Sequence, residues 1–261
     1  MQVNLEQVLG WTTEAGQIAR TMQFTQLELQ YKAAEELVTE ADRAVEAFLL
    51  DKIRSHFPDH SINAEESGEL MQSSEHKWFI DPIDGTTNFA HRMPIFSVSV
   101  AYAYRGELQL GVVYNPAMDE TFYAVKGKGA FLNGKAIRVS TVKLLNDSLA
   151  ITGFRKELLG TPKSNLNNFV RFCQECQTVR RLGSAALDLA YVACGRADGF
   201  WEIALNPYDV AAGALIALEA GAIVDGLYGE GDLLSGKVDI LAANPDVFPQ
   251  MLQVLLEERI S

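Results

Sequence analysis

Apolar residues in the first part of the chain recur at two different spacings. Residues 5–22 and 41–53 repeat them at the spacing of an amphipathic helix, and Thr39 is a candidate N-cap for the second helix. After Pro58 the pattern changes to short β-like runs that are separated by Gly, Asn and Pro. These runs cover residues 61–64, 78–80, 96–104, 109–114 and 121–125. We therefore expect two amphipathic helices followed by a mostly antiparallel sheet.

Helical and strand-like segments alternate in the second part of the chain, from about Leu145. Strands are expected up to Thr152 and over residues 199–203, 223–224 and 239–242. Helices are expected through Phe169 and Phe172 and over residues 184–194, 207–220 and 245–258. This order predicts an α+β fold, a layered sandwich of helices and sheets in two halves, residues 1–142 and 143–261. The hinge between the halves is expected within residues 139–146.

The composition of the 261 residues is typical of a soluble globular protein, with 48% hydrophobic and 21% charged residues. The net charge of −12 argues against a surface built to bind nucleic acid or an anionic membrane. Residues 1–20 contain Glu6 and Glu14 and have no long apolar run, which predicts neither a signal peptide nor a membrane span. The odd number of cysteines, Cys173, Cys176 and Cys194, suits a reducing compartment. We expect a cytoplasmic protein without a membrane or direct nucleic-acid partner.

The segment from Trp78 to Phe89 is the most informative in the chain. An apolar run ends at Asp81, and Pro82 removes a backbone donor, so we expect Asp81 at the end of a strand. Asp84 follows in a turn, where both carboxylates can converge on one point and the Ile83 carbonyl can add a third oxygen. Taken alone, this pair is explained equally well as an ordinary polar turn.

The next residues extend this segment toward an anion site. Gly85 permits close backbone approach, and Thr86 and Thr87 can begin a short helix whose N–H groups favour an anion. Mg²⁺ binds through oxygen atoms, takes only one or two protein carboxylates, and completes its shell with water and substrate phosphate. A turn of carboxylates beside an anion site therefore suits metal-assisted chemistry on a phosphate group.

Two further acidic places could complete such a metal site. Glu65 and Glu66 follow the run of residues 61–64, and Asp209 lies in the first turn of a helix begun by Pro207. Taken alone, each has a structural explanation, because surface glutamates are solvated and a carboxylate at a helix start stabilises the helix dipole. Only the combination with Asp81 and Asp84 favours a metal site.

The stretches that carry these residues resemble the inositol monophosphatase family, within the lithium-sensitive sugar and inositol phosphatases. They are residues 37–42, 63–68, 81–89 and 207–213, and residues 183–186 and 197–202 lie in order between the last two. The third and fourth stretches, paired in this order, are highly specific. The resemblance implies the αβαβα sandwich of inositol monophosphatases and fructose-1,6-bisphosphatases. It places most metal ligands in residues 1–142, and Asp209 with the substrate-recognition residues in residues 143–261.

The resemblance also implies two or three Mg²⁺ ions in each active site. Glu65, Asp81 and the Ile83 carbonyl would hold one ion, and Asp81, Asp84 and Asp209 would hold a second. A third, weaker ion would use Glu65. Glu66 and Thr86 would polarise the attacking water, with Asp42 close to their hydrogen bonds. The Gly85 and Thr86 amides would receive phosphate oxygens, and substrate hydroxyls would meet Asp84, the Ala185 N–H, Glu202 and Asp209.

The activity implied by the resemblance is hydrolysis of myo-inositol 1-phosphate, or a related small sugar-alcohol phosphate, by metal-activated water. Inhibition by Li⁺ and a homodimer are implied as well. Other substrates stay open, namely fructose 1,6-bisphosphate, 3′-phosphoadenosine 5′-phosphate, NADP and histidinol phosphate. A regulatory role with the RNA-processing and transcription machinery also stays open, because a bacterial relative in this family acts there.

Two positions depart from the family pattern. Tyr208 stands where the family has a tryptophan before the last metal-binding aspartate, and the flexible-loop lysine is matched only by Lys32, at best shifted by one residue. Neither change removes a ligand. The C-x-x-C spacing of Cys173 and Cys176 lacks a second pair, and no histidine has the H-E-x-x-H spacing, so no zinc site is expected. Residues 127–130 precede a hairpin rather than a helix, which argues against a phosphate loop.

Overall fold

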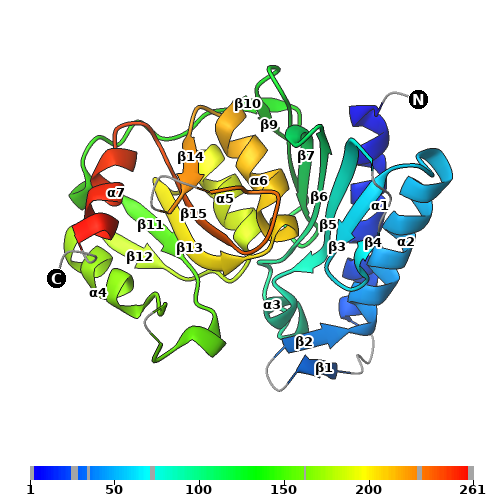
Figure 1. The fold of residues 1–261 in the computed structure, drawn as a ribbon, viewed down its shortest axis with the longest axis horizontal. Helices are drawn as coiled ribbons and strands as arrows, with labels where there is room; N and C mark the ends of the chain where they lie inside the picture. The colour runs from blue at the N-terminus through cyan, green and yellow to red at the C-terminus, as the bar shows by residue number, and fades with distance from the viewer. Residues whose placement is uncertain are drawn as a thin grey trace.

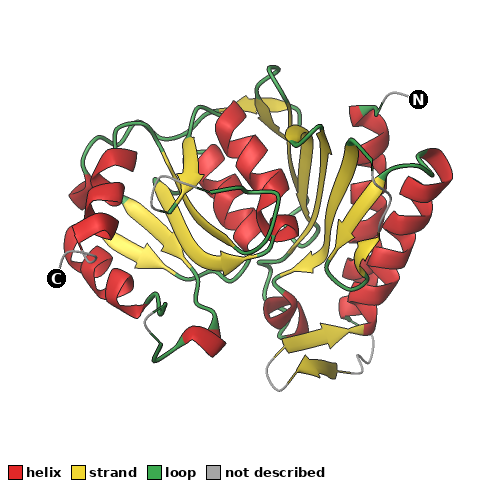
Figure 2. Ribbon diagram, viewed as in Figure 1, coloured by secondary structure: helices red, strands yellow, loops and turns green. Residues whose placement is uncertain are grey.

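The computed structural model describes residues 3–24, 29–33, 36–70, 74–161, 163–227 and 231–257, with only the backbone described for 29–33 and 36–39. Helices and sheets alternate in layers, with a pair of helices between the two large sheets and further helices on both outer sides (Figures 1 and 2). The predicted α+β fold and its αβαβα layering are confirmed. No helix among the described residues is long and apolar enough to cross a membrane. The side chain of Lys32 lies outside the described part, and the division at residues 142 and 143 stays a prediction.

The first outer layer consists of helices α1 (Leu5–Gln23) and α2 (Glu40–His56), which pack on one face of the larger sheet (Figure 1). The Asn4 side chain caps α1 by accepting a hydrogen bond from the Glu6 N–H at 2.8 Å. In the apolar stripe of α1, Val8, Ala15 and Ala19 are fully buried. Both helices predicted from their periodicity are therefore confirmed.

The larger sheet has eight strands in the order β10-β9-β8-β7-β6-β5-β3-β4, and every neighbouring pair is antiparallel except β3 with β5. The mostly antiparallel sheet is confirmed. Its strands are β3 (Ser61–Ala64), β4 (Gly68–Leu70), β5 (His76–Asp84), β6 (Ser97–Tyr104), β7 (Glu107–Asn115), β8 (Glu120–Val125), β9 (Ala130–Leu132) and β10 (Lys135–Ile137). A separate antiparallel pair, β1 (Leu29–Ala33) and β2 (Glu36–Thr39), lies near the short helix α3 (Thr86–Ala90).

Strand β5 runs further than its sequence predicts. We expected it to end at Asp81, but it continues to Asp84. The pairing with β6 shifts between Asp81, opposite Ser99, and Asp84, opposite Ser97, so Pro82 and Ile83 form a bulge. A bulge residue needs no ladder hydrogen bond, which is why Pro82 is tolerated there. The bulge places both aspartates at the same end of the sheet.

The middle layer consists of helices α5 (Ala185–Ala193) and α6 (Pro207–Glu219), which pack against each other between the two large sheets. They are apolar on nearly all sides because both sheets cover them. Small residues permit this close packing: a Cβ on Gly111 of β7 would lie 2.8 Å from the Ala212 carbonyl oxygen. The first turns of α5 and α6 consequently reach the edge where β5 ends.

The second sheet has the order β12-β11-β13-β15-β14, with β11 parallel to β12 and β13 and the other pairs antiparallel. Helices α4 (Leu166–Glu175) and α7 (Phe248–Glu257) cover its outer face. The strands are β11 (Leu149–Thr152), β12 (Thr178–Arg180), β13 (Gly199–Leu205), β14 (Ile223–Gly226) and β15 (Val238–Ala243). The last helix starts later than the expected residue 245, because Asn244 accepts hydrogen bonds from the Asp246 and Val247 N–H groups in a turn.

Candidate active site

An open cleft of about 200 Å³ lies where β5, α3, β13 and the first turns of α5 and α6 meet. The lining includes most of the residues singled out in the sequence, namely Glu65, Asp81, Ile83, Asp84, Gly85, Thr86, Ala185, Glu202 and Asp209. Asp42 and Glu66 do not line the cleft but lie beside Glu65. The structure thus brings together every residue that the sequence proposed for the site.

Asp81 is the most enclosed acid of the cleft. It is 3% exposed, and its Oδ1 atom has no hydrogen-bond partner among the described residues. Burial raises the pKa of Asp81 well above its ordinary value, and the nearby charges of Glu65, Asp84 and Asp209 raise it further. An acceptor atom without a donor, surrounded by other carboxylates, is suited to a cation.

Asp84 is held by the start of helix α5. Its Oδ2 accepts hydrogen bonds from the Ser184 hydroxyl at 2.6 Å and the Ala186 N–H at 2.8 Å, and its Oδ1 accepts one from the Ala185 N–H at 3.2 Å. Burial raises the pKa of Asp84 to about 7, although these hydrogen bonds act in the opposite direction. The Ala185 N–H, which is expected to meet a substrate hydroxyl, donates to Asp84 in this structure.

Asp209 caps its own helix. Its Oδ2 accepts a hydrogen bond from the Asn206 N–H at 2.7 Å, as expected for a carboxylate in the first turn of α6. Burial raises the pKa of Asp209, while the Asn206 hydrogen bond and the charges of Arg155 and Lys237 lower it. Asp209 can therefore cap α6 and also offer an oxygen to a metal ion, because only its Oδ2 atom makes the cap.

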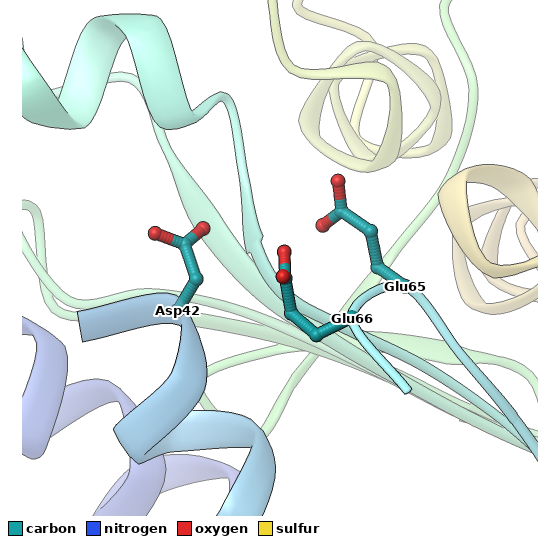
Figure 3. Close-up of side chains that lie close together, drawn as sticks. All are labelled: Asp42, Glu65 and Glu66. Atoms are coloured by element: carbon teal, nitrogen blue, oxygen red, sulfur yellow. The ribbon is translucent and has the colours of Figure 1, made fainter. Parts of the chain in front are cut away.

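Three carboxylates from two segments face one another beside the cleft (Figure 3). Asp42 lies in the first turn of α2, and Glu65 and Glu66 lie in the turn after β3. Each offers a carboxylate oxygen, and these atoms lie within 4.8 Å of one another. The Thr86 hydroxyl lies 3.3 Å from Asp42 Oδ1 and 3.1 Å from the Ile83 carbonyl oxygen. Asp42 and Thr86 are thus in contact, as the resemblance implied.

A buried carboxylate fixes the turn that carries Glu65 and Glu66. Glu46, one helical turn after Asp42 on α2, is 2% exposed. It accepts hydrogen bonds from the Glu66 N–H at 2.8 Å and from the Ser67 hydroxyl at 2.5 Å. The Glu65 N–H donates to the Ile80 carbonyl oxygen at 3.1 Å, next to Asp81. The turn is therefore tied to both α2 and β5.

Glu202 faces the cleft from β13, with its carboxylate against Gly153. It is 8% exposed, and burial together with the charge of Asp209 raises the pKa of Glu202 to about 8, while Arg155 lowers it. A Cβ atom on Gly153 would lie 2.1 Å from Glu202 Oε1. Only glycine at position 153 leaves room for the Glu202 carboxylate in this position.

The carboxylates of the cleft fit hard divalent cations. Glu65, Asp81, Asp84 and Asp209 offer only oxygen donors, as Mg²⁺ prefers. Burial raises the pKa of Asp81, Asp84 and Asp209 because their negative charges lack sufficient compensation. Bound cations would supply the missing positive charge.

Sequence reasoning missed several residues of the cleft. Ser184 could have been found, because it precedes the helical pattern that begins at Ala185, where a hydroxyl often accepts or donates at a helix end. Gly153, Arg155 and Arg181 also line the cleft. Their segments have no periodic pattern that would place them, so only the folded chain identifies them.

Comparison with known proteins agrees with this geometry. The sequence profile of the inositol monophosphatase family matches residues 2–260. The Escherichia coli protein named Nus factor SuhB is 44% identical over 234 residues, which cover 89% of this chain and 87% of that protein. A Synechocystis protein named inositol-1-monophosphatase is 46% identical over 224 residues, covering 85% of this chain and 77% of that protein.

A solved structure agrees as well. The structure of inositol monophosphatase from Anabaena has a TM-score of 0.86 and is 39% identical, covering 97% of this chain and 95% of that chain. The match to the family profile, over residues 2–260, includes every segment that lines the cleft. On this similarity of sequence and fold, the chain belongs to the inositol monophosphatase family.

Proposed function

We propose that this protein is a Mg²⁺-dependent phosphomonoesterase that hydrolyses myo-inositol 1-phosphate or a related small sugar-alcohol phosphate. The observation that carries the proposal is the convergence of Glu65, Asp81, Asp84 and Asp209, from distant parts of the chain, on one cleft. The buried Oδ1 atom of Asp81 supports it, because this atom has no hydrogen-bond partner among the described residues and Asp81 feels the charges of Glu65, Asp84 and Asp209. The family relationship supports it independently.

The chain's own atoms suggest how the metal ions would be held. Glu65, Asp81 and the Ile83 carbonyl would bind one Mg²⁺, and Asp81, Asp84 and Asp209 a second, with Glu65 available to a third, weaker ion. When bound, Mg²⁺ supplies a water of lowered pKa and positive charge against the phosphate and the departing oxygen. Because phosphate esters hydrolyse very slowly without a catalyst, this neutralisation of charge is the main source of acceleration.

Other residues orient the reactants. Glu66 and Thr86 hold the attacking water as hydrogen-bond partners, and Asp42 fixes the Thr86 hydroxyl from 3.3 Å. The Gly85 and Thr86 N–H groups donate to phosphate oxygens, since no side chain of the described residues caps the start of α3. Gly85 has φ of +94°, which favours glycine at this turn. The attack by water needs no covalent phosphoenzyme.

The alcohol part of the substrate contacts the carboxylates of Glu202, Asp209 and Asp84. Glu202 and Asp209 accept hydrogen bonds from substrate hydroxyls, and Asp84 contributes where its oxygens are not engaged. The Ala185 N–H meets a substrate hydroxyl, as the resemblance implies, and it also donates to Asp84 at 3.2 Å. A cleft of about 200 Å³ suits a small phosphorylated alcohol.

The test is phosphate release from purified protein with and without Mg²⁺. The substrates are myo-inositol 1-phosphate, fructose 1,6-bisphosphate, 3′-phosphoadenosine 5′-phosphate, NADP and histidinol phosphate. We expect Mg²⁺-dependent release, inhibition by Li⁺, and loss of release in Asp84→Asn, which keeps the shape of the side chain. Absence of release from every substrate with Mg²⁺ present would exclude the proposed activity.

A second candidate function is a regulatory role with the RNA-processing and transcription machinery. It is favoured by the 44% identity to the E. coli protein named Nus factor SuhB. The role need not depend on catalysis, so Asp84→Asn separates the two. The wild type and Asp84→Asn would each be expressed in a bacterial strain that lacks its own homologue of this protein. Both should restore growth equally if the regulatory role does not depend on catalysis. A homodimer is expected, and analytical ultracentrifugation measures it.

A further inference from the structure

Two arginines reach the cleft that the carboxylates line. Arg155 lies in the segment after β11, and Arg181 lies directly after β12. Both line the cleft together with Glu202 and Asp209. Neither is needed by the chemistry proposed above, in which carboxylates hold cations and backbone amides hold the phosphate. Their presence in an otherwise acidic cleft therefore requires its own explanation.

Arg155 is anchored by a specific feature of β13. Its Nε donates to the Ala204 carbonyl oxygen at 3.1 Å. Ala204 has φ of +59° and lies in a bulge of β13 between Glu202 and Leu205. This left-handed backbone conformation is unfavourable for an alanine. The Ala204 N–H is held in turn by Asp239 Oδ1 at 2.8 Å.

This anchoring leaves the far end of Arg155 available. Its Nη2 lies 3.9 Å from Asp209 Oδ2, beyond hydrogen-bond distance, and the side chain is 23% exposed. Nε is engaged with the backbone, and the two terminal nitrogens make no hydrogen bond among the described residues. From this distance the Arg155 charge forms an ion pair with Asp209 and lowers its pKa. The pair is not the two-point hydrogen bond that arginine often makes with a carboxylate, so the terminal donors stay available to a ligand.

Arg181 approaches the same place from another segment. Its guanidinium makes no hydrogen bond or ion pair within the part of the chain that the structure describes. Its charge nevertheless lowers the pKa of Glu202, which places it within electrostatic range of that carboxylate. Its neighbour Arg180 differs, because that guanidinium donates to Thr178 Oγ1 and the Val179 carbonyl oxygen and does not line the cleft.

We infer that Arg155 and Arg181 together bind a second anionic group, a phosphate or a carboxylate, carried by the alcohol part of the substrate. A guanidinium presents a planar set of donors that matches either group, and such charged hydrogen bonds are stronger than neutral ones. The inference rests on the proposed phosphatase activity and shifts its preferred substrate from myo-inositol 1-phosphate, which has no second anion, to a phosphorylated alcohol that carries one. Esters with a second anion are preferred over otherwise similar esters without one.

The experiment compares matched pairs of substrates that differ in the second anion. Fructose 1,6-bisphosphate against fructose 1-phosphate tests a second phosphate, and 3-phosphoglycerate against glycerol 3-phosphate tests a carboxylate. The measured quantity is the ratio of kcat/KM within each pair, at constant ionic strength and saturating Mg²⁺. For wild type we expect a ratio of about ten or more in at least one pair, which also identifies the anion.

The variants are Arg181→Gln and Arg155→Gln, with Arg180→Gln as the matched control. Replacing either arginine of the cleft should lower the ratio of kcat/KM by about tenfold or more, since charged hydrogen bonds contribute about 1.5–3 kcal/mol. Arg180→Gln should leave the ratio as in wild type. If Arg155→Gln fails to fold because its bond to Ala204 is lost, Arg181→Gln still decides the question.

Two results would overturn the inference. One is a wild-type ratio near one in both pairs. The other is an equal loss on both members of a pair in Arg181→Gln, which would show that the arginine only offsets the acidic cluster. If the wild type hydrolyses none of the four esters, the separate panel that includes myo-inositol 1-phosphate decides the proposed function. The same ratios, measured as binding affinities by calorimetry, then decide the inference.

Discussion

At the scale of a single residue, the position of Asp81 is unfavourable for the stability of the metal-free chain. It is buried among other carboxylates, and one of its oxygens has no donor among the described residues. Buried groups of like charge destabilise the folded chain unless something compensates them. Perturbed acids of this kind cluster at functional sites. The cations that Asp81 is proposed to hold would explain why a carboxylate occupies this buried position.

Gly153 offers the sharpest residue-scale prediction. In Gly153→Ala the new methyl group would overlap the Glu202 carboxylate, with a Cβ only 2.1 Å from Oε1. A flexible side chain can move aside, so we expect the protein to fold. Glu202 would, however, leave the position proposed to meet substrate hydroxyls. KM for the best substrate should rise about tenfold, with kcat changed less, as measured by steady-state kinetics.

The control for this prediction is Gly10→Ala. Gly10 is an exposed residue inside α1, and a Cβ there meets nothing within 4 Å. It should raise the stability by about 0.5–1 kcal/mol and leave the kinetics as in wild type. Equal kinetics in the two alanine variants would contradict the role given to Gly153.

Single residues also show where sequence reasoning succeeds. Asp81, Asp84 and Asp209 were found because each lies in a short motif whose local chemistry can be read from neighbouring residues. Gly153 was not found, because its purpose is to leave space for Glu202, which is 49 positions away along the chain. A glycine whose role is to leave space for a distant side chain produces no local pattern in the sequence.

At the scale of elements, helix α2 positions two parts of the site at once. It carries Asp42 in its first turn and Glu46 one turn later, and Glu46 holds the Glu65–Ser67 turn through two hydrogen bonds. The distance between Asp42 and Glu66 therefore depends on a single helix. Element positions were predictable from periodicity, but this connection was not, because hydrogen bonds to a distant turn produce no periodic signal.

Glu46→Gln tests this connection. The amide nitrogen of glutamine cannot accept a hydrogen bond, so either the Glu66 N–H or the Ser67 hydroxyl loses its partner. We expect kcat to fall about tenfold and the Mg²⁺ concentration for half-maximal activity to rise, measured at a temperature where the variant is fully folded. Asp51→Asn removes an exposed carboxylate from the same helix and is the control. A Glu46→Gln enzyme that matches this control in both quantities would refute the positioning role.

The bulge in β5 shows why boundaries were harder to predict than elements. Pro82 suggested the end of a strand, since proline cannot donate to a ladder. The strand instead continues to Asp84, because the bulge removes the need for that hydrogen bond. Whether proline ends a strand or enters a bulge depends on the neighbouring strand β6, and the local sequence does not contain that information.

At the scale of the whole molecule, the layers bring the site together. The cleft combines residues from β5, the turn after β3, β13 and the starts of α5 and α6. The middle helices fix the two sheets relative to each other, and their first turns hold Asp84 and Asp209. The layered fold was predictable from the order of elements and from the resemblance, whereas the contacts across layers required the folded structure.

The stability of the whole protein should depend on pH and on Mg²⁺ together. Burial raises the pKa of Asp84 from 3.8 to about 7 and the pKa of Glu202 from 4.5 to about 8. Between pH of about 4 and about 8, Asp84 and Glu202 have lost their protons in the unfolded chain but keep them in the metal-free folded chain. The folded state therefore binds more protons, and its stability falls as the pH rises from about 4 to about 8.

We expect the unfolding midpoint of the metal-free protein, measured by circular dichroism in EDTA, to fall between pH 5 and pH 8. A change of 1 kcal/mol corresponds to roughly 2–4 °C in a protein of this size. Stabilisation by Mg²⁺ should be larger at pH 8, because cations bind the ionised carboxylates. Asp84→Asn should make the metal-free slope shallower. A midpoint that rises over this range, with an Mg²⁺ effect equal at both pH values, would contradict the electrostatic account.

The most direct test of the central claim is a crystal structure of the protein soaked with Mn²⁺ and inorganic phosphate, with the ions located by anomalous scattering. The account predicts one ion bound by Asp81, Asp84 and Asp209 and another bound by Glu65 and Asp81, with phosphate against the Gly85 and Thr86 amides. Ions bound elsewhere, or no ion among these four carboxylates at saturating Mn²⁺, would contradict it.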